Sequence, residues 1–223
     1  MEERGKKDMT GSIDFEELAR LHEAAYLPYG VNWDRRRTAK AKQQKELDPA
    51  PLQRVIDLTN VMLSVCGYSP VKDPVVSGAK LERLLSFKDL SYSDRESKYE
   101  AEFGVPKGRF IWMKFSQSGH VGVVAAGADI NFDAYDRGRR IKSDMFVKAC
   151  GLTWDTSYVL VFPLPASWDV VEDLHVVETL VGNYLIASGV PIIDCYSHNY
   201  SNQPVDHNIR KKYRDIALRC RDK

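Results

Sequence analysis

Three closely spaced segments rich in β-branched and aromatic residues constrain the fold of this chain more than any other feature. They lie near residues 109–116, 120–133 and 157–162. Segments of this composition favour β-strands. The first two are separated by Ser-Gln-Ser-Gly at residues 116–119, and a short connection containing glycine is typical of a β-hairpin. We therefore expect a central antiparallel sheet.

Helices are expected before and after these strands. The clearest lies near residues 50–66, where apolar side chains recur at helical spacing, and another is expected near 170–188. The charged segment 87–104 is expected to be loop with partial helix, 190–196 a short buried strand and 208–220 a basic helix. Because helices, strands and a helix–strand–helix unit come in separate blocks, the order predicts an α+β fold. Its parts are N-terminal helices, a central antiparallel sheet and a C-terminal helix–strand–helix.

The length of the chain, 223 residues, suits one globular folding unit. The residue composition and pattern of the sequence change near residue 70. We therefore predict an N-terminal helical segment, residues 1–70, packed on an α+β core formed by residues 71–223.

Composition limits the classes of partner and the compartment. The net charge of +1 provides no global attraction to nucleic acid or membrane. No apolar run approaches the roughly 18 residues that span a bilayer, and the N-terminus lacks the apolar core of a secretory signal. The four cysteines are widely spread and form no Cys-x-x-Cys motif, which favours reduced thiols. We expect a cytoplasmic protein without a membrane partner.

Two segments are locally basic although the whole chain is not. Residues 33–48 carry six basic and three acidic residues, and residues 205–223 carry seven and three. The first favours helix but has almost no apolar stripe, so we expect it to project into solvent or to lie on a partner. Basic helices bind phosphates, although ordinary solvated faces have similar compositions. The candidate binding residues are Arg35, Arg36, Arg37, Arg210, Lys211, Lys212 and Tyr213.

These segments give the leading functional interpretation, a non-catalytic cytosolic binding module or regulator that contacts a macromolecule, either nucleic acid or a protein. No phosphate-binding loop, dinucleotide motif, nucleophile elbow or zinc-protease motif is present, and the sequence identifies no cofactor. The sequence therefore does not decide whether the protein is an enzyme.

The alternative function is a hydrolase, metal-dependent or not, that acts on a phosphoester. Glu178 lies on the same helical stripe as Leu174 and Val181, and a carboxylate in an apolar stripe is costly unless it is paired. Asp194 ends the strand that returns from this helix, and His198 follows four residues later. A carboxylate beside a histidine suits general acid–base chemistry. The structural alternative places Glu178 at the edge of the stripe, bonded to an arginine or a tyrosine.

Acidic residues at 129, 133 and 136, with Asn131, have the oxygen spacing of a calcium loop. The glycine and the glutamate that an EF-hand needs at positions 6 and 12 are replaced by alanine and arginine. Apolar residues alternate with the polar ones, and this period of two favours a strand with a polar face. We therefore predict an extended segment at 129–133 and no metal site there.

Two further sets of residues suggest chemistry less strongly. Thiols and imidazoles are zinc ligands, and the C-terminal region offers such a set: Cys195, His198, His207 and Cys220. A polar loop leading into a helix is the simpler explanation of these residues. His120 and Cys150 are a conceivable base and nucleophile. Cys150 precedes a glycine at an expected helix end, and a small buried thiol is the simpler interpretation.

Overall fold

A computed structural model describes residues 33–87, 90–105, 109–127, 142–165, 170 and 173–195. Its centre is a four-stranded sheet with the order β1-β4-β2-β3, in which every neighbouring pair is antiparallel. The strands are β1 (Val75–Ser77), β2 (Phe110–Phe115), β3 (Val121–Ala126) and β4 (Tyr158–Pro163). The fold is therefore α+β, as predicted, and β2 and β3 form the expected hairpin.

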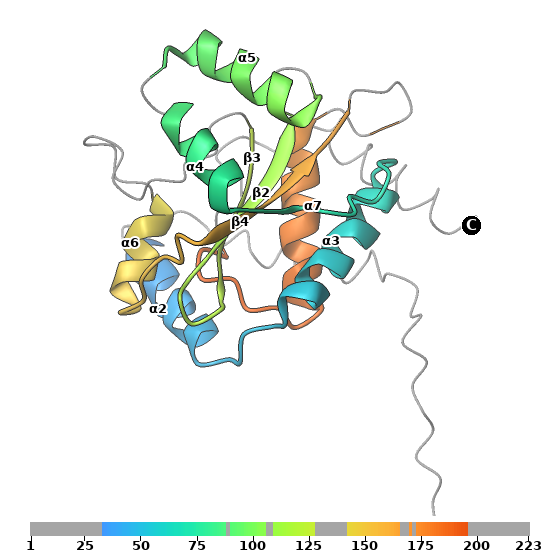
Figure 1. Ribbon diagram of the computed structural model, residues 1–223. Coiled ribbons are helices and arrows are strands. Elements are labelled where there is room, and N and C mark those ends of the chain that lie inside the picture. Colours follow the sequence, from blue (N-terminus) through green and yellow to red (C-terminus); the bar gives the residue numbers. More distant parts are fainter. Residues whose placement is uncertain are drawn as a thin grey trace, which may run out of the picture.

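Helices cover both faces of this sheet (Figure 1). Helices α3 and α7 lie on one side, α4 and α5 on the other, and α2 and α6 lie together near one end. Their bounds are Trp33–Lys45 for α2, Leu52–Val65 for α3, Gly78–Ser86 for α4, Tyr92–Phe103 for α5, Lys142–Ala149 for α6 and Leu174–Ala187 for α7. The two predicted sheet-covering helices correspond to α3 and α7.

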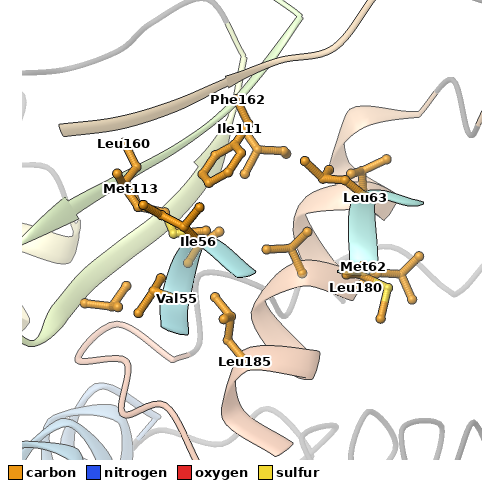
Figure 2. Close-up of a cluster of buried hydrophobic side chains, with 14 of the residues drawn as sticks. Val55, Ile56, Met62, Leu63, Ile111, Met113, Leu160, Phe162, Leu180 and Leu185 are labelled. Atoms are coloured by element: carbon orange, nitrogen blue, oxygen red, sulfur yellow. The ribbon is translucent and has the colours of Figure 1, made fainter. Parts of the chain in front are cut away.

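The larger core lies between the sheet and the helices α3 and α7. Ile111 and Met113 of β2 enter it together with Leu160 of β4, because alternate side chains of a strand point to the same face. Figure 2 shows these side chains meeting Ile56 of α3 and Leu180 of α7. This contact explains the apolar spacing near residues 50–66.

The opposite face of the sheet forms a second core beneath α4 and α5. Phe110 and Trp112 of β2 pack here with Leu84 of α4 and Tyr99 of α5. All six residues of β2 are buried, because helices cover both faces of this central strand. The strand therefore has a continuous apolar pattern instead of a simple alternation.

Helix α2 packs on its own chain, whereas its lack of an apolar stripe predicted that it would project into solvent or lie on a partner. Ala41 is buried in a third cluster with Phe146, Cys150 and Ile193. The side-chain oxygen of Gln44 also accepts a hydrogen bond from the backbone N–H of Ile192, at 3.3 Å. Burial of the small Ala41 and the polar Gln44 is enough to fix the helix on the rest of the protein, so α2 does not need a wide apolar stripe.

Several predicted elements differ from the observed ones. Residues 92–103 form the continuous helix α5 where loop with partial helix was expected, and the strand β1 was not predicted. The expected strand at 190–196 is reduced to an isolated parallel bridge between Ile192 and Val121. Strand β3 ends at Ala126, and residues 128–141 lie outside the described residues, as do 196–223. Among the described helices, none combines the length and apolar character needed to cross a membrane.

Candidate functional site

Glu178 is the most buried acidic side chain on α7, with 1% of its surface exposed. Its carboxylate accepts a hydrogen bond from the backbone N–H of Ala126, with 3.0 Å between nitrogen and oxygen. Ala126 ends β3 at the edge of the sheet. The next residue, Gly127, donates its N–H to the carbonyl oxygen of Phe110 in β2, so the N–H of Ala126 points away from that strand. Glu178 thus satisfies a backbone donor that a further strand would otherwise bind.

His175 connects this buried carboxylate to solvent. Its Nδ1 atom lies 3.6 Å from Oε2 of Glu178, an ion-pair distance that is long for a hydrogen bond. The imidazole side chain is 60% exposed, whereas the Glu178 side chain is 2% exposed. One turn of α7 therefore carries a buried carboxyl group and an exposed imidazole in contact.

Burial and mutual interaction shift the pKa values of both groups. Burial raises the pKa of Glu178, while His175 and the Ala126 N–H oppose this shift by favouring the charged carboxylate. The neighbouring carboxylate of Glu178 raises the pKa of His175, although partial burial of the imidazole acts in the opposite direction. The result is a pair of groups that both hold a proton more strongly than they do in water.

Asp194 is the second predicted site residue that the structure describes. It is buried, and its negative charge adds to the rise in the pKa of Glu178. Its backbone N–H donates to the carbonyl oxygen of Gly122, at 3.0 Å, which fixes it beside β3. The structure thus brings Glu178 and Asp194 to the same edge strand. His198 lies outside the described residues, and His175 was missed because it lies off the apolar stripe that identified Glu178.

The metal-binding candidates fall mostly outside the described residues. Within the described part of the chain, no group of three histidine, cysteine, aspartate or glutamate side chains is arranged to hold a metal ion. Cys195 is the single described member of the proposed zinc set, and its side chain is partly exposed. His198, His207 and Cys220 lie outside the described residues, as does the acidic stretch 129–136.

The first basic segment ends with exposed lysines in the last turn of α2, and α6, which packs against α2, also has an exposed lysine in its last turn. Lys42 and Lys45 are exposed in the last turn of α2, and Lys148 is exposed in the last turn of α6. Burial raises the pKa of the Cys150 thiol, and the positive charges of Lys45 and Lys42 oppose that rise. Both lysines therefore lie near the end of α6. We call Lys42, Lys45 and Lys148 the lysine face.

The other predicted binding residues are only partly described. Arg35, Arg36 and Arg37 lie in the first turns of α2. Arg210, Lys211, Lys212 and Tyr213 lie outside the described residues. Lys40 is exposed, but at 100° per residue it lies on the flank of α2 opposite Lys42 and Lys45.

His120 does not have the arrangement considered for a cysteine nucleophile. Its Nδ1 lies 2.9 Å from Oγ of Ser118, and its Nε2 lies 2.9 Å from the carbonyl oxygen of Leu47. Both ring nitrogens thus have partners other than Cys150. The Cys150 thiol is buried and burial raises its pKa, which disfavours the reactive thiolate. The simpler interpretation, a buried structural thiol, agrees with this environment.

Comparisons with protein-family models, curated proteins and solved structures found no significant match to this chain. The class defined by the fold is an α+β domain, and functional inference depends on the sites described above.

Proposed function

We propose that this protein is a binding module that contacts a phosphate-bearing macromolecule, a nucleic acid, through the lysine face and the adjoining basic segments. The observation that carries the proposal is the exposure of lysines in the last turns of two helices that pack against each other. Lys42 and Lys45 are exposed near the end of α6, where Lys148 is also exposed. Clustered lysines attract the phosphate backbone without reading base sequence.

The packing of α2 supports this role. The helix buries Ala41 and Gln44, while the lysines on its outer side stay in solvent. Arg35 precedes Lys42 by seven residues, so the two positions lie on one stripe of the helix. Because only a narrow strip of the surface of α2 is buried, basic residues on its other sides can contact an extended anion such as a nucleic acid.

A structural explanation competes with this proposal. Lysines in the last turn of a helix interact favourably with its carbonyl end, by roughly 0.3–1 kcal/mol each. The lysine face would then stabilise α2 and α6 without binding anything. The two explanations differ because binding requires an affinity for polyanions, whereas helix stabilisation does not.

Fluorescence anisotropy with a labelled DNA duplex and a labelled single strand at low salt tests the proposal. We expect binding by the natural chain and a loss of about tenfold or more when Lys42, Lys45 and Lys148 are all changed to glutamine. A matched double variant, Lys72→Gln with Lys98→Gln, neutralises exposed lysines elsewhere and should change affinity by less than about twofold. Equal losses in both variants, or no binding by the natural chain, would reject the lysine face as the interface.

A second variant tests the wider set of basic residues predicted from sequence. Neutralising Arg35, Arg36 and Arg37 should weaken binding further, because they continue the basic helix towards its start. Neutralising Arg210, Lys211 and Lys212 should weaken it independently if the C-terminal segment contributes.

A second candidate function is general acid–base catalysis, specifically hydrolysis of a phosphoester. The observation that favours it is the contact between buried Glu178 and exposed His175, with Asp194 nearby. A carboxyl group whose pKa is raised keeps its proton to a higher pH than an ordinary carboxyl group, and the imidazole provides a route to solvent. His198 remains part of this proposal because it follows Asp194 closely in the chain.

A panel of nitrophenyl phosphate mono- and diesters, with and without divalent metal ions, tests the second candidate. Turnover should disappear in Glu178→Gln, in which the side-chain amide oxygen can still accept the Ala126 N–H. Glu100→Gln, an exposed change on α5, is the matched control and should leave turnover unchanged. Absence of turnover in the natural chain, or equal turnover in Glu178→Gln, would reject this candidate.

A further inference from the structure

The turn between β2 and β3 contains a histidine whose hydrogen-bond partners determine the tautomer of the neutral ring. Nε2 of His120 lies 2.9 Å from the carbonyl oxygen of Leu47, which can only accept a hydrogen bond. Nε2 therefore carries the proton of the neutral imidazole, and Nδ1 is left as an acceptor. Oγ of Ser118 lies 2.9 Å from Nδ1, so the Ser118 hydroxyl donates to it.

Ser116 closes a ring of hydrogen bonds with these two residues. The backbone N–H of His120 donates to Oγ of Ser116 at 3.2 Å, and the hydroxyl oxygens of Ser116 and Ser118 lie 2.9 Å apart. Since the proton of Ser118 is directed to His120, the Ser116 hydroxyl is the donor between the two serines. The arrangement contains a hydroxyl group, a base that accepts its proton and a carbonyl group that orients the base.

The surroundings hold the base rigidly and leave the hydroxyl accessible. His120 is 6% exposed, whereas Ser118 lies in the exposed part of the turn. The N–H of Gly119 donates to the carbonyl oxygen of Ser116 at 2.8 Å, and Gly119 has a φ of 87°, which favours glycine. The turn lies beside the chain that leaves α2, where Leu47 supplies the carbonyl group (Figure 1).

From this geometry we propose that Ser118 is a nucleophile that accepts the acyl group of a carboxylic ester, with His120 as its general base. Leu47, which is 50% exposed, and Pro49 lie next to the turn, so apolar side chains would be available to contact a small apolar acyl group. The proposal is independent of the lysine face and of Glu178, since it uses different residues and a different reaction.

The reaction balances without a cofactor. Oγ of Ser118 attacks the ester carbonyl carbon while Nδ1 of His120 takes the hydroxyl proton. The bond between the carbonyl carbon and the leaving oxygen then breaks, and that oxygen receives the proton from Nδ1 and departs as an alcohol. Water next attacks the acyl carbon of the acylated Ser118 while Nδ1 accepts a proton from it. The bond between that carbon and Oγ then breaks, and Nδ1 returns the proton to Oγ, which releases a carboxylic acid and restores the hydroxyl group.

A structural role for the same hydrogen bonds would tie the turn to the chain after α2 and give no reactivity. Incubation of the full chain with p-nitrophenyl acetate separates the two roles, with nitrophenolate release followed by absorbance and the acetylated residue identified by peptide mass spectrometry. We expect one acetyl group on Ser118 and its loss in Ser118→Ala. Ser157→Ala is the matched control, because the exposed Ser157 hydroxyl donates to the Asp155 carboxylate instead of an imidazole.

The role of the base is tested by His120→Gln, with the fold checked by circular dichroism. Loss of general-base assistance should slow acetylation of Ser118 by about a hundredfold or more. If this buried substitution unfolds the protein, the comparison of the natural chain with Ser118→Ala still decides the proposal, since Ser118 is exposed. Acetylation confined to lysines, or equal Ser118 acetylation in a folded His120→Gln, would overturn it.

Discussion

Replacing Gly122 with alanine should destabilise the protein through a direct clash with Trp154. A Cβ atom built on Gly122 would lie 2.2 Å from Cζ3 and 2.7 Å from Cη2 of the Trp154 ring. Carbon atoms pack favourably at about 3.5–4.0 Å, so the ring must retreat by more than about 1 Å. The glycine is required here for space and not for an unusual backbone angle.

The retreat of the ring has two costs. Overpacking of this kind costs about 1–3 kcal/mol. Displacing Trp154 also weakens its contact with the ammonium group of Lys114, which lies 4.5 Å from the ring centre. Lys114 is buried, and a desolvated contact between a cation and an aromatic ring contributes about 0.5–2 kcal/mol. The expected loss in the free energy of unfolding for Gly122→Ala is therefore about 1.5–5 kcal/mol.

Urea unfolding followed by tryptophan fluorescence and far-ultraviolet circular dichroism measures this loss. With a slope of about 1–3 kcal/mol per molar urea, the midpoint should fall by roughly 0.5 M or more. In a Trp154→Ala background the same glycine substitution should cost less than about 0.5 kcal/mol, because the clash is gone. A change below about 0.5 kcal/mol in the natural chain, or an equal cost in both backgrounds, would refute the steric reasoning.

Three further predictions concern titration, a backbone clamp and calcium. Because the pKa of Glu178 is raised in the folded protein, the free energy of unfolding should fall as the pH rises above 4.5, the pKa of an ordinary glutamate. The pKa of His175 is also raised, so its stabilising contribution should be complete below pH 6.5 and lost as the pH rises through its folded pKa. Urea titrations at several pH values should give a flatter profile in Glu178→Gln, and an unchanged profile would contradict the assignment. The Asn60 side chain donates to the carbonyl oxygen of Val71 at 3.0 Å and accepts from the Val71 N–H at 2.9 Å, which forms a two-bond clamp on the backbone. Asn60→Ala should therefore lower the free energy of unfolding in urea by about 1–3 kcal/mol, and a loss under about 0.5 kcal/mol would show that the clamp is dispensable. Calcium should leave the melting temperature unchanged, because a strand at 129–133 provides no metal site. A real site filled at 100 times its dissociation constant would add about 2.7 kcal/mol to the free energy of unfolding, so a rise in melting temperature that Asp129→Ala abolishes would contradict the predicted strand.

The strands with strong patterns were predictable from sequence, and the short one was not. Strand β2 is rich in aromatic residues, β3 contains three valines, and a glycine turn lies between them, so local composition identifies the hairpin. Strand β1 has three residues, too few for a period of two to be recognised. Its strand character comes from pairing with β4, where Val76 lies opposite Val159. That pairing joins residues far apart in the chain, and local sequence does not specify it.

Helix α5 carried local signals that hydrophobic periodicity did not reveal. The Ser91 hydroxyl accepts the N–H of Asp94 at 3.2 Å, a typical helix start. Gly104 ends the helix with a φ of 67°, a conformation common at helix ends. The charged residues between these caps suggested a loop, whereas the contact of buried Tyr99 with the sheet holds the helix in place.

The sites differ in how much of their geometry the sequence specifies. The burial of Glu178 could be predicted from its place on an apolar helical stripe. The position of Asp194 near Glu178 could be predicted because the chain returns along the sheet after this helix. The Ser118–His120 arrangement depends on the carbonyl oxygen of Leu47, 73 residues earlier in the chain. The hydrogen-bond direction that leaves Nδ1 of His120 as an acceptor is set by that long-range contact, which explains why sequence spacing did not reveal it.

The salt dependence of nucleic-acid binding tests the central functional claim most directly. The logarithm of the binding constant for duplex DNA should fall linearly with the logarithm of the salt concentration, because each lysine–phosphate contact releases counterions. Changing Lys42, Lys45 and Lys148 to glutamine should reduce the magnitude of that slope by about 2–3, close to 0.9 for each lost contact. The control variant with Lys72 and Lys98 replaced should keep the natural slope. An unchanged slope in the lysine-face variant would contradict the assignment of this surface as the phosphate-binding interface.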